Sequence, residues 1–546
     1  MGEIAECAAR TTAAGLLCGA TVNLRVGPEA REKRRRAARS PKAGATLGPR
    51  SAHPLDSLSI TPTLAGQGTF HLPSPGARGI FRALFTYRIM TLTEKLLSRA
   101  SGKARVQPGD NAWVNVDVLM THDVCGPGTI GVFKREFGAD AKVWDRDKVV
   151  IIPDHYIFTA DSLSNRNVDI LRDFVREQGL KYFYDVIDDP NGHWKFDPTK
   201  GQLKQQYGKN FAGVCHTTLP WKGHTRPGEV LVGTDSHTCM AGAFNQFATG
   251  IGNTDAGFVL GTGKILLKVP ETMRFFLEGQ LSPGVMAKDV ILHVIGDIGF
   301  DGATYRAMQW EGPGALALDM DDRMTITNMA IEAGGKNGIF PYDEKCGAYV
   351  RERVAENGTK ANFEPVDVDR EQSFVFDKTY DLAKLEPTVA CHPDPGNRKL
   401  AREMTDVKLD RAYIGSCTGG KTSDFLAFAR VVKGHSVKIH TFGVPATTKV
   451  VAELKAAQMD GKSVWSILEN AGVQMTENAS CAACLGGPQD TFGRMNEKAL
   501  KCISATNRNF PGRMGHKESQ VFLASPYTVA ASALTGHVTD PREMLG

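Results

Sequence analysis

Residues 411–420, RAYIGSCTGG, join a short apolar stretch to a glycine-rich turn that carries a cysteine. Arg411–Ile414 has the character of a strand, and Ser423–Val432 behind it has the spacing of a helix. Backbone N–H groups at such a turn stabilise a thiolate and its negatively charged ligand. The stretch therefore predicts a strand–turn–helix unit of an α/β protein, with Cys417 at the end of the strand.

A second cysteine motif, CAACLGG, occupies residues 481–487. Cys481 and Cys484 can place two sulfurs on one metal centre, and the glycines let backbone amides approach the sulfides of a cluster. A zinc site would require four ligands, and the sequence has no second C-x-x-C or C-x-x-H. A redox pair of the thioredoxin type would leave Cys417 unexplained. Three thiolates on a four-iron cluster would leave one iron without a protein ligand, as a Lewis acid for a substrate hydroxyl and carboxylate.

Candidate acids and bases follow three predicted strands. They are His122-Asp123 after Ala112–Met120, Asp154-His155 after Lys148–Ile152, and Asp235-Ser236-His237 after Glu229–Val232. A carboxylate beside an imidazole raises the pKa of the imidazole, so the histidine can act as a protonated acid near neutral pH. Any single pair could equally be a helix cap or a turn. Three pairs at strand ends favour one active site, because α/β sites form beyond the carboxyl ends of strands.

Residues 507–513, NRNFPGR, place Arg508 and Arg513 on either side of a Pro-Gly turn. Two guanidinium groups held in this way could form a rigid fork for a dicarboxylate. Taken alone, they could also be surface charges. Their position soon after the C-x-x-C motif favours a place in the same domain.

The composition is that of a soluble globular protein with two or three domains. The chain has 546 residues, of which 42% are apolar and 23% are charged. No run of 18 apolar residues predicts a membrane span. The eleven cysteines are odd in number and widely spaced, which favours a reduced compartment over a secreted disulfide scaffold.

The first 90 residues differ from the rest. They carry 13 Lys and Arg against 5 Asp and Glu, a net charge of +8, whereas the remainder carries 52 against 55, a net charge of −3. The Arg-, Ala- and Ser-rich composition is typical of an organelle transit peptide, although four glutamates (Glu3, Glu6, Glu29 and Glu32) are not. A disordered extension or a misassigned start codon is the alternative. The slightly acidic body gives no support for binding to nucleic-acid phosphates.

Other segments complete the expected α/β organisation. Thr91–Ser101 is predicted to be a capped helix and Asn167–Gln178 a further helix. The glycines of residues 250–263 match no nucleotide-binding loop, and we interpret them as sites of close backbone packing. Residues 391–397, CHPDPGN, have the composition of a linker.

With these motifs in order, residues 91–546 resemble the aconitase superfamily, most closely the isopropylmalate dehydratase large subunits of plants and algae. The motifs are VGTDSHT (232–238), GSCTGG (415–420), CAACLGG (481–487) and NRNFPGR (507–513). The resemblance implies three α/β domains, at 91–270, 271–390 and 391–546, around a [4Fe–4S] cluster. It assigns the cluster to Cys417, Cys481 and Cys484 and leaves one iron open.

The resemblance also implies roles for single residues. Asp154-His155 would protonate the departing hydroxyl, and Arg508 and Arg513 would bind substrate carboxylates. The other implied catalytic residues are His216, Asp235, His237 and Glu332, and the other substrate contacts are His122, Ser236, Asn328 and Asn507. In aconitase a glutamine that contacts substrate stands at the position of His122, so the resemblance implies a substrate contact from this histidine.

The implied reaction converts 2-isopropylmalate into 3-isopropylmalate through 2-isopropylmaleate, by loss and return of water in leucine biosynthesis. Aconitases continue into a fourth, swivel domain that supplies the catalytic serine base. This sequence ends at Gly546, so we expect a separate small subunit to supply that domain. We expect import into the plastid stroma, with the mitochondrion as the alternative. Competing functions are a homoaconitase or methylthioalkylmalate isomerase large subunit and, in another class, an RNA-binding protein that resembles cluster-free aconitase.

Overall fold

The computed structural model describes residues 89–189, 192–193, 207–495 and 498–545. The predicted transit peptide, residues 1–90, lies almost entirely outside the described residues. The first described helix, α4 (Leu92–Ser101), begins as predicted: the Thr91 hydroxyl accepts the Glu94 N–H, and the Glu94 carboxylate accepts the Thr91 N–H. This reciprocal capping pairs two N–H groups that the first turn would leave without partners.

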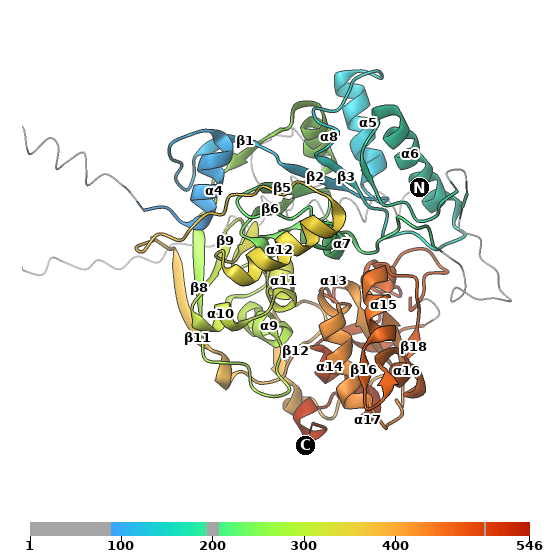
Figure 1. The fold of residues 1–546 in the computed structure, drawn as a ribbon. Coiled ribbons are helices and arrows are strands. Elements are labelled where there is room, and N and C mark those ends of the chain that lie inside the picture. The colour runs from blue at the N-terminus through green and yellow to red at the C-terminus, as the bar shows by residue number, and fades with distance from the viewer. Residues whose placement is uncertain (1–88, 190–191, 194–206, 496–497, 546) are drawn as a thin grey trace, which may run out of the picture. The chain divides into compact units, whose positions relative to one another are not determined.

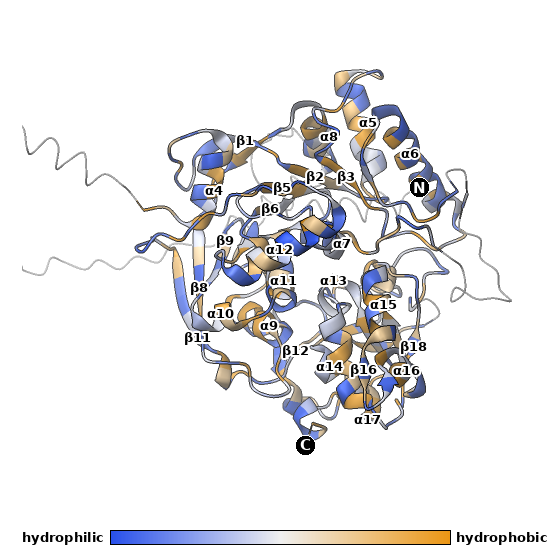
Figure 2. Cartoon of the chain, viewed as in Figure 1, coloured by the Kyte–Doolittle hydropathy of each residue, from blue (hydrophilic) through white to orange (hydrophobic). Residues whose placement is uncertain are grey.

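The first sheet has five parallel strands in the order β4-β3-β2-β5-β6. They are β2 (Val118–Thr121), β3 (Val149–Ile151), β4 (Tyr182–Phe183), β5 (Val230–Gly233) and β6 (Phe247–Gly250). The helical segments of this region are α5 (Gly126–Phe137), α6 (Ser162–Gln178), α7 (Cys215–Trp221), η2 (Ser236–Phe244) and α8 (Asn253–Thr262). Figure 2 shows why the layers form: β2 and β3 are largely hydrophobic, whereas α6 carries long hydrophilic stretches. Burial on both faces accounts for the continuous apolar strands.

The single strand predicted over Ala112–Met120 is wrong. The chain forms two strands, β1 (Asn111–Asn115) and β2, in different sheets, with β1 pairing antiparallel to β7 (Lys264–Lys268). The switch occurs where the Val116 N–H donates to Gly263 and the Asp117 N–H donates to Val230. An alternating pattern of side chains cannot show that the hydrogen-bonding partner changes midway.

Two glycines of the 250–263 stretch allow helices α5 and α8 to pack closely, as the sequence predicts. A Cβ on Gly257 would lie 2.6 Å from Val132 Cγ1, and a Cβ on Gly261 would lie 2.4 Å from the ring of Phe137. The two helices lie side by side in Figure 1. Larger residues would therefore force them apart.

The second sheet has four parallel strands in the order β10-β9-β8-β11. They are β8 (Thr272–Glu278), β9 (Ala307–Glu311), β10 (Asn337–Ile339) and β11 (Phe376–Asp381). Its helical segments are α9 (Ala287–Ile298), α10 (Pro313–Ala317), α11 (Met320–Asn328), η3 (Met329–Ala333), α12 (Glu344–Asn357) and η4 (Leu382–Lys384).

The third sheet has seven strands in the order β13-β12-β20-β19-β14-β15-β18. They are β12 (Thr388–Ala390), β13 (Arg398–Leu400), β14 (Arg411–Gly415), β15 (His440–Val444), β18 (Gln474–Met475), β19 (Lys501–Ser504) and β20 (Gln520–Leu523), with β16 (Gln458–Met459) and β17 (Lys462–Ser463) as a separate hairpin. Its helical segments are η5 (Ala401–Glu403), α13 (Ser416–Gly419), α14 (Thr422–Val432), α15 (Thr448–Ala456), α16 (Val464–Asn470), η6 (Ala482–Leu485), α17 (Pro526–Thr535) and η7 (Pro541–Glu543). The predicted strand 411–414 and helix 423–432 are thus present.

The linker predicted at residues 391–397 is wrong, because this stretch is the turn between antiparallel strands β12 and β13 of one sheet. The Asn509 amide holds it by donating to the carbonyls of Ala390 and Asp394. The division into three domains stays a prediction, and the sheets favour placing its last boundary before Thr388. No helix of the described residues is long and apolar enough to cross a membrane.

Candidate active site

The three predicted cluster cysteines are buried free thiols on two turns of the third sheet region. Cys417 lies in α13, directly after β14, while Cys481 precedes η6 and Cys484 lies within it. Next to them, Ser416 has a φ of 72° and Ala482 a φ of 45°. Left-handed backbone is costly for residues with a Cβ and is concentrated at functional sites, so both turns have the character of ligand-holding loops.

Polar side chains are directed at the sulfur atoms. Asn328 Nδ2 and Asn507 Nδ2 donate to Cys417 Sγ over 3.1 and 3.4 Å. Cys484 Sγ donates to Asn507 Oδ1 over 3.5 Å, and Arg513 Nη2 donates to Cys484 Sγ over 3.8 Å. The structure therefore brings Asn328, Asn507 and Arg513, three of the predicted substrate contacts, to the cysteines; their contact with substrate stays a prediction.

The thiols differ in their acidity. Burial and the charge of Cys484 raise the pKa of Cys417 to about 11. A hydrogen bond from Cys481, together with Arg513, lowers the pKa of Cys484 well below its ordinary value, while the same bond and burial raise the pKa of Cys481. The pKa values of the paired thiols are thus shifted in opposite directions.

These residues fit an iron–sulfur cluster. The donor set consists of soft sulfur ligands, and the surrounding N–H groups can donate to thiolate sulfur, as groups around Fe–S clusters commonly do. The burial that raises the pKa of the free thiols also excludes water from a bound cluster.

Asp154 and His155 form a tightly bonded acid–imidazole pair. Asp154 Oδ1 lies 2.6 Å from His155 Nδ1, and Asp154 Oδ2 accepts the Cys215 N–H over 2.7 Å. Burial alone would lower the pKa of His155, but Asp154 and then Asp235 outweigh it and raise the pKa well above 6.5. His155 is therefore an imidazolium near neutral pH.

Asp123 has a different role from the one that the His122-Asp123 pair suggests. Its Oδ1 accepts the N–H groups of Asp154 and His155, and its Oδ2 accepts the N–H of Tyr156. The carboxylate thus shapes the turn that carries the acid. Asp123 is thus an example of the turn that the sequence allows as the alternative to an acid–base role.

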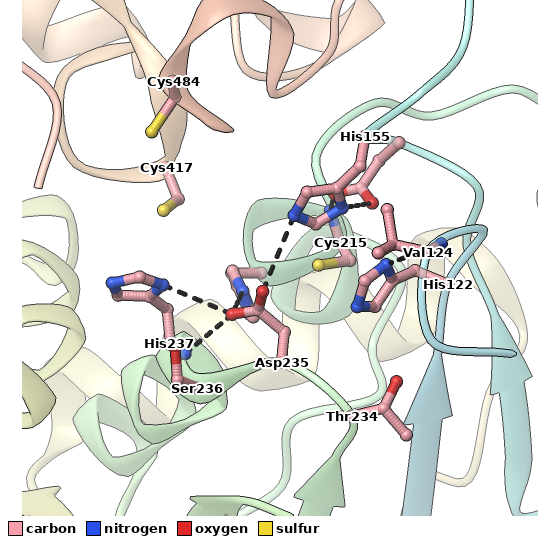
Figure 3. A network of polar contacts seen from close by, with 12 residues as sticks. His122, Val124, His155, Cys215, Thr234, Asp235, Ser236, His237, Cys417 and Cys484 are labelled. Atoms are coloured by element: carbon pink, nitrogen blue, oxygen red, sulfur yellow. Dashed lines mark hydrogen bonds and ion pairs between the residues drawn. The ribbon is translucent and has the colours of Figure 1, made fainter. Parts of the chain in front are cut away.

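Asp235 is the centre of a histidine network, which Figure 3 shows between His155 and His237. Its Oδ1 lies 2.8 Å from His216 Nε2 and 3.3 Å from His237 Nδ1, and its Oδ2 lies 3.6 Å from His155 Nε2. Burial opposes ionisation, but His216 and the hydrogen bonds of all three rings lower the pKa of Asp235 well below 3.8. The carboxylate stays charged and fixes the rings.

Glu332 joins this network to the predicted arginine fork. Its Oε1 lies 2.7 Å from His237 Nε2 and accepts from Arg508 Nε over 2.7 Å. Arg508 Nη2 also donates to Ser236 Oγ over 2.9 Å. Although burial would raise the pKa of Glu332, Arg508 and His237 lower it.

Three buried nitrogen atoms around the network lack a hydrogen-bond partner among the described residues: His122 Nε2, His216 Nδ1 and Arg513 Nε. The His122 ring stacks on the ring of His155 with centroids 4.3 Å apart, and Figure 3 shows the two together. Buried polar atoms without partners are costly in a protein that binds nothing there. They therefore mark places that a polar ligand can satisfy.

Two groups of acid and imidazole donors have atoms within 4.8 Å of one another: His122, Asp123, Asp154 and His155, and His216, Asp235 and His237. In both groups the carboxylates already accept from backbone N–H groups or lie against imidazole rings. An acid–base network explains them better than a second metal site.

Comparison with known proteins covers most of the chain. The sequence matches the model of the aconitase family (aconitate hydratase) over residues 94–401 and 397–536. The chain belongs to the aconitase family. The predicted α/β fold class and family are thereby confirmed.

Members of the aconitase family from distant organisms align along most of the chain. The chloroplastic 3-isopropylmalate dehydratase large subunit of Arabidopsis thaliana is 58% identical over 477 residues, 86% of this chain and 89% of the relative. The 3-isopropylmalate dehydratase large subunit 1 of Methanopyrus kandleri is 42% identical over 458 residues, 83% of this chain and 99% of the relative. The solved structure of aconitase X from Thermococcus kodakaraensis in its holo form has a TM-score of 0.38 and 11% identity over 80% of this chain and 94% of that one, too low to add to the assignment.

Two further residues lie at this aconitase-family site without a sequence motif that marks them. Lys288, on α9, is fully buried behind Cys417; burial and the charge of Lys421 lower its pKa to about 7. Asp490 accepts from the Thr159 hydroxyl and the Ala160 N–H, and so connects the loop after Cys484 to the loop after His155. Neither residue belongs to a recognisable sequence motif, so only the structure identifies it.

Proposed function

We propose that the chain is the cluster-bearing large subunit of a 3-isopropylmalate dehydratase, which interconverts 2- and 3-isopropylmalate through 2-isopropylmaleate. The observation that carries the proposal is the convergence of three buried cysteines with Asp154-His155 and Arg508 on one site, in a chain 58% identical to a large subunit of that name. Membership of a hydro-lyase family supports the reaction class.

Cys417, Cys481 and Cys484 would hold a [4Fe–4S] cluster. When bound, the cluster supplies a Lewis acid at the iron without a protein ligand, which polarises a substrate hydroxyl and carboxylate. Asn328 and Asn507 orient Cys417 through the bonds to its sulfur.

His155 would be the general acid. Asp154 holds the imidazolium through Nδ1, so the Nε2 proton faces the site beside Asp235. Transfer of that proton to the substrate hydroxyl lets the oxygen leave as water, which is a far better leaving group than hydroxide. In the reverse direction the neutral imidazole accepts a proton from water.

Arg508 and Arg513 would bind the two substrate carboxylates. Arg508 Nε and Nη2 are fixed by Glu332 and Ser236, and Arg513 Nε is buried without a partner among the described residues. A guanidinium held on one edge presents its remaining N–H groups in a fixed direction, which suits a planar carboxylate. His122 Nε2 and His216 Nδ1 are further places for polar substrate atoms.

A small subunit would complete the enzyme. The relatives named above are large subunits, a name that implies a small-subunit partner. We propose that the partner supplies a swivel domain with the catalytic base.

The proposed location is the plastid stroma, because the Arabidopsis relative is chloroplastic and residues 1–90 carry a net charge of +8. A fluorescent fusion of residues 1–90 that stays in the cytosol would contradict this location.

The decisive experiment is reconstitution. The chain is loaded anaerobically with iron and sulfide, mixed with a small subunit, and assayed with 2-isopropylmalate, homocitrate and a methylthioalkylmalate. We expect the visible absorbance of an iron–sulfur cluster and turnover of 2-isopropylmalate that requires the small subunit. Cys481→Ser, the matched control, should lose the absorbance and the turnover. Preference for homocitrate would contradict the substrate, and full activity of the chain alone would contradict the partner.

A further inference from the structure

Lys288 is a fully buried lysine at the start of α9, in the second sheet region. Its Nζ donates to Thr418 Oγ1 over 3.2 Å, to the Ala505 carbonyl over 3.1 Å and to the Thr506 carbonyl over 2.6 Å. An ammonium has three N–H donors and no acceptor, so three acceptor oxygens match the protonated amine.

No carboxylate lies within ion-pair distance of Lys288 among the described residues. The adjacent Asp289 carboxylate accepts the N–H groups of Thr388 and Met286 instead. Asp424 is already paired with Lys421 at 2.8 Å. Burial and then the charge of Lys421 lower the pKa of Lys288 to about 7, so the free amine is only partly protonated near neutral pH. An anion in its surroundings would offset the cost of the buried charge and hold the amine protonated.

The two segments that Lys288 binds both lead to the cluster site. Thr418 directly follows Cys417, and Thr506 directly precedes Asn507, whose amide contacts both Cys417 and Cys484. The amine therefore fixes the turn of one cysteine to the end of β19. The neighbouring groups that would become anionic on binding a cluster are the thiols of Cys417 and Cys484.

We propose that Lys288 is a positioning residue of the cluster site, which aligns the segments carrying Cys417 and Asn507 and supplies the positive charge that balances the thiolate-bound cluster. This inference rests on the proposed iron–sulfur site and adds a residue outside its motifs. Lys288 touches neither substrate nor iron; it acts through Thr418 and Thr506.

The test compares wild type with Lys288→Met, which removes charge and donors, and Lys288→Arg, which keeps both. Lys345→Met is the control: Lys345 also donates to three acceptor oxygens, all backbone carbonyls, but it is exposed and lies near α10, away from the three cysteines. We expect Lys288→Met to lose iron to a chelator about ten- to a hundredfold faster than wild type. Its cluster should have a more negative midpoint potential, because a positive charge favours the reduced state. Lys288→Arg should retain most of the wild-type lifetime, and Lys345→Met should behave as wild type.

A purely structural role would lower the thermal midpoints of the cluster-free and reconstituted proteins equally. The inference instead expects Lys288→Met to reduce the stabilisation gained on reconstitution. Lys288→Gln removes the charge but keeps N–H donors, and it replaces the Met variant if that protein does not fold. If the Gln variant had the midpoint potential and the rate of iron loss of wild type, the inference about Lys288 would be wrong, while the proposed function would stand. Absence of iron from the wild-type protein would overturn the proposed function and the inference together.

Discussion

His155 keeps its proton because two carboxylates flank a ring that burial alone would neutralise. The same logic fixes the direction of a pH effect. The pKa of His155 is raised in the folded protein, so its acid form is present below that pKa and is lost as the pH rises through it.

Asp154→Asn should therefore lower the pKa of His155 and move the alkaline limb of the kcat/KM profile to lower pH, by about one unit or more. The measurement is the pH profile of the reconstituted enzyme, with iron content determined in parallel to show that the cluster is intact. His155→Gln, as the control, should lack this limb altogether. An alkaline limb in Asp154→Asn at the wild-type position would exclude Asp154 as the source of the raised pKa.

His224 is a second buried histidine, with the opposite charge state. The Tyr184 hydroxyl lies 2.7 Å from its Nε2, and burial, followed by the charge of Arg226, lowers its pKa from 6.5 to about 3. Below about pH 6.5 the His224 imidazole binds a proton in the unfolded chain but stays neutral in the folded chain until the pH approaches 3. Its contribution to stability is thus complete above pH 6.5 and is lost as the pH falls towards 3.

His224→Gln retains an acceptor for Tyr184 but does not titrate. Between pH 6.5 and about pH 4.5, the free energy of unfolding of wild type should fall more steeply than that of the variant, by about 1.4 kcal/mol per pH unit. Urea unfolding across this range checks it. Parallel curves for the two proteins would mean that the buried imidazole is protonated after all.

The site residues that the sequence predicts are those that lie in short, local motifs. Cys417, the C-x-x-C pair and Arg508 lie in short motifs whose chemistry can be recognised within a few residues. Lys288 cannot be recognised in this way, because its acceptors are 130 to 218 residues away. Asp123 shows a related limit: its adjacency to His122 in sequence could not separate an acid–base role from a turn, because it does not reveal that the carboxylate binds backbone N–H groups.

At the scale of elements, the contact between α5 and α8 depends on the absence of side chains. Gly257→Ala should destabilise the protein by about 1–3 kcal/mol, since the new methyl group would meet Val132 and the Phe133 backbone. Gly131→Ala is the control on α5: nothing lies within 4 Å of its Cβ position, so it should stabilise by about 0.5–1 kcal/mol. Thermal unfolding of both variants measures the difference. Equal shifts would show that helix propensity, and not packing, dominates at Gly257.

Element boundaries show the same limit of sequence reasoning. The cap at Thr91 was predictable, because Thr91 and Glu94 bond to each other. The division of 112–120 into β1 and β2 depends on Gly263 and Val230, and the turn 391–397 depends on Asn509. Both predictions were wrong because the structure of each segment depends on hydrogen-bond partners far away in the sequence.

At the scale of the whole described chain, the site draws on all three sheets: His155 and Asp235 from the first, Asn328 and Glu332 from the second, and Cys417 and Arg508 from the third. The Asp490 carboxylate reinforces this arrangement by accepting from Thr159 and Ala160 of the first region.

Asp490→Ala should leave both donors without an acceptor, lower the stability of the reconstituted protein by about 1–3 kcal/mol and reduce kcat. Glu177→Ala serves as the control, because it removes an exposed ion pair with Lys134 worth less than about 1 kcal/mol. Thermal unfolding and steady-state assays with the partner subunit measure both effects. Unchanged stability would mean that the loops after Cys484 and His155 do not depend on this carboxylate.

One backbone hydrogen bond limits how the two loops of the site can evolve independently. The Cys481 N–H donates directly to the Asp154 carbonyl over 2.9 Å. The loop that carries Cys481 and the loop that carries Asp154 and His155 are therefore joined through main-chain atoms, and among replacements of Cys481 only proline would remove the donor. We therefore expect the Cys481 loop and the Asp154-His155 loop to change together in evolution. A designer who transplants one of these loops into another scaffold should transplant the other as well.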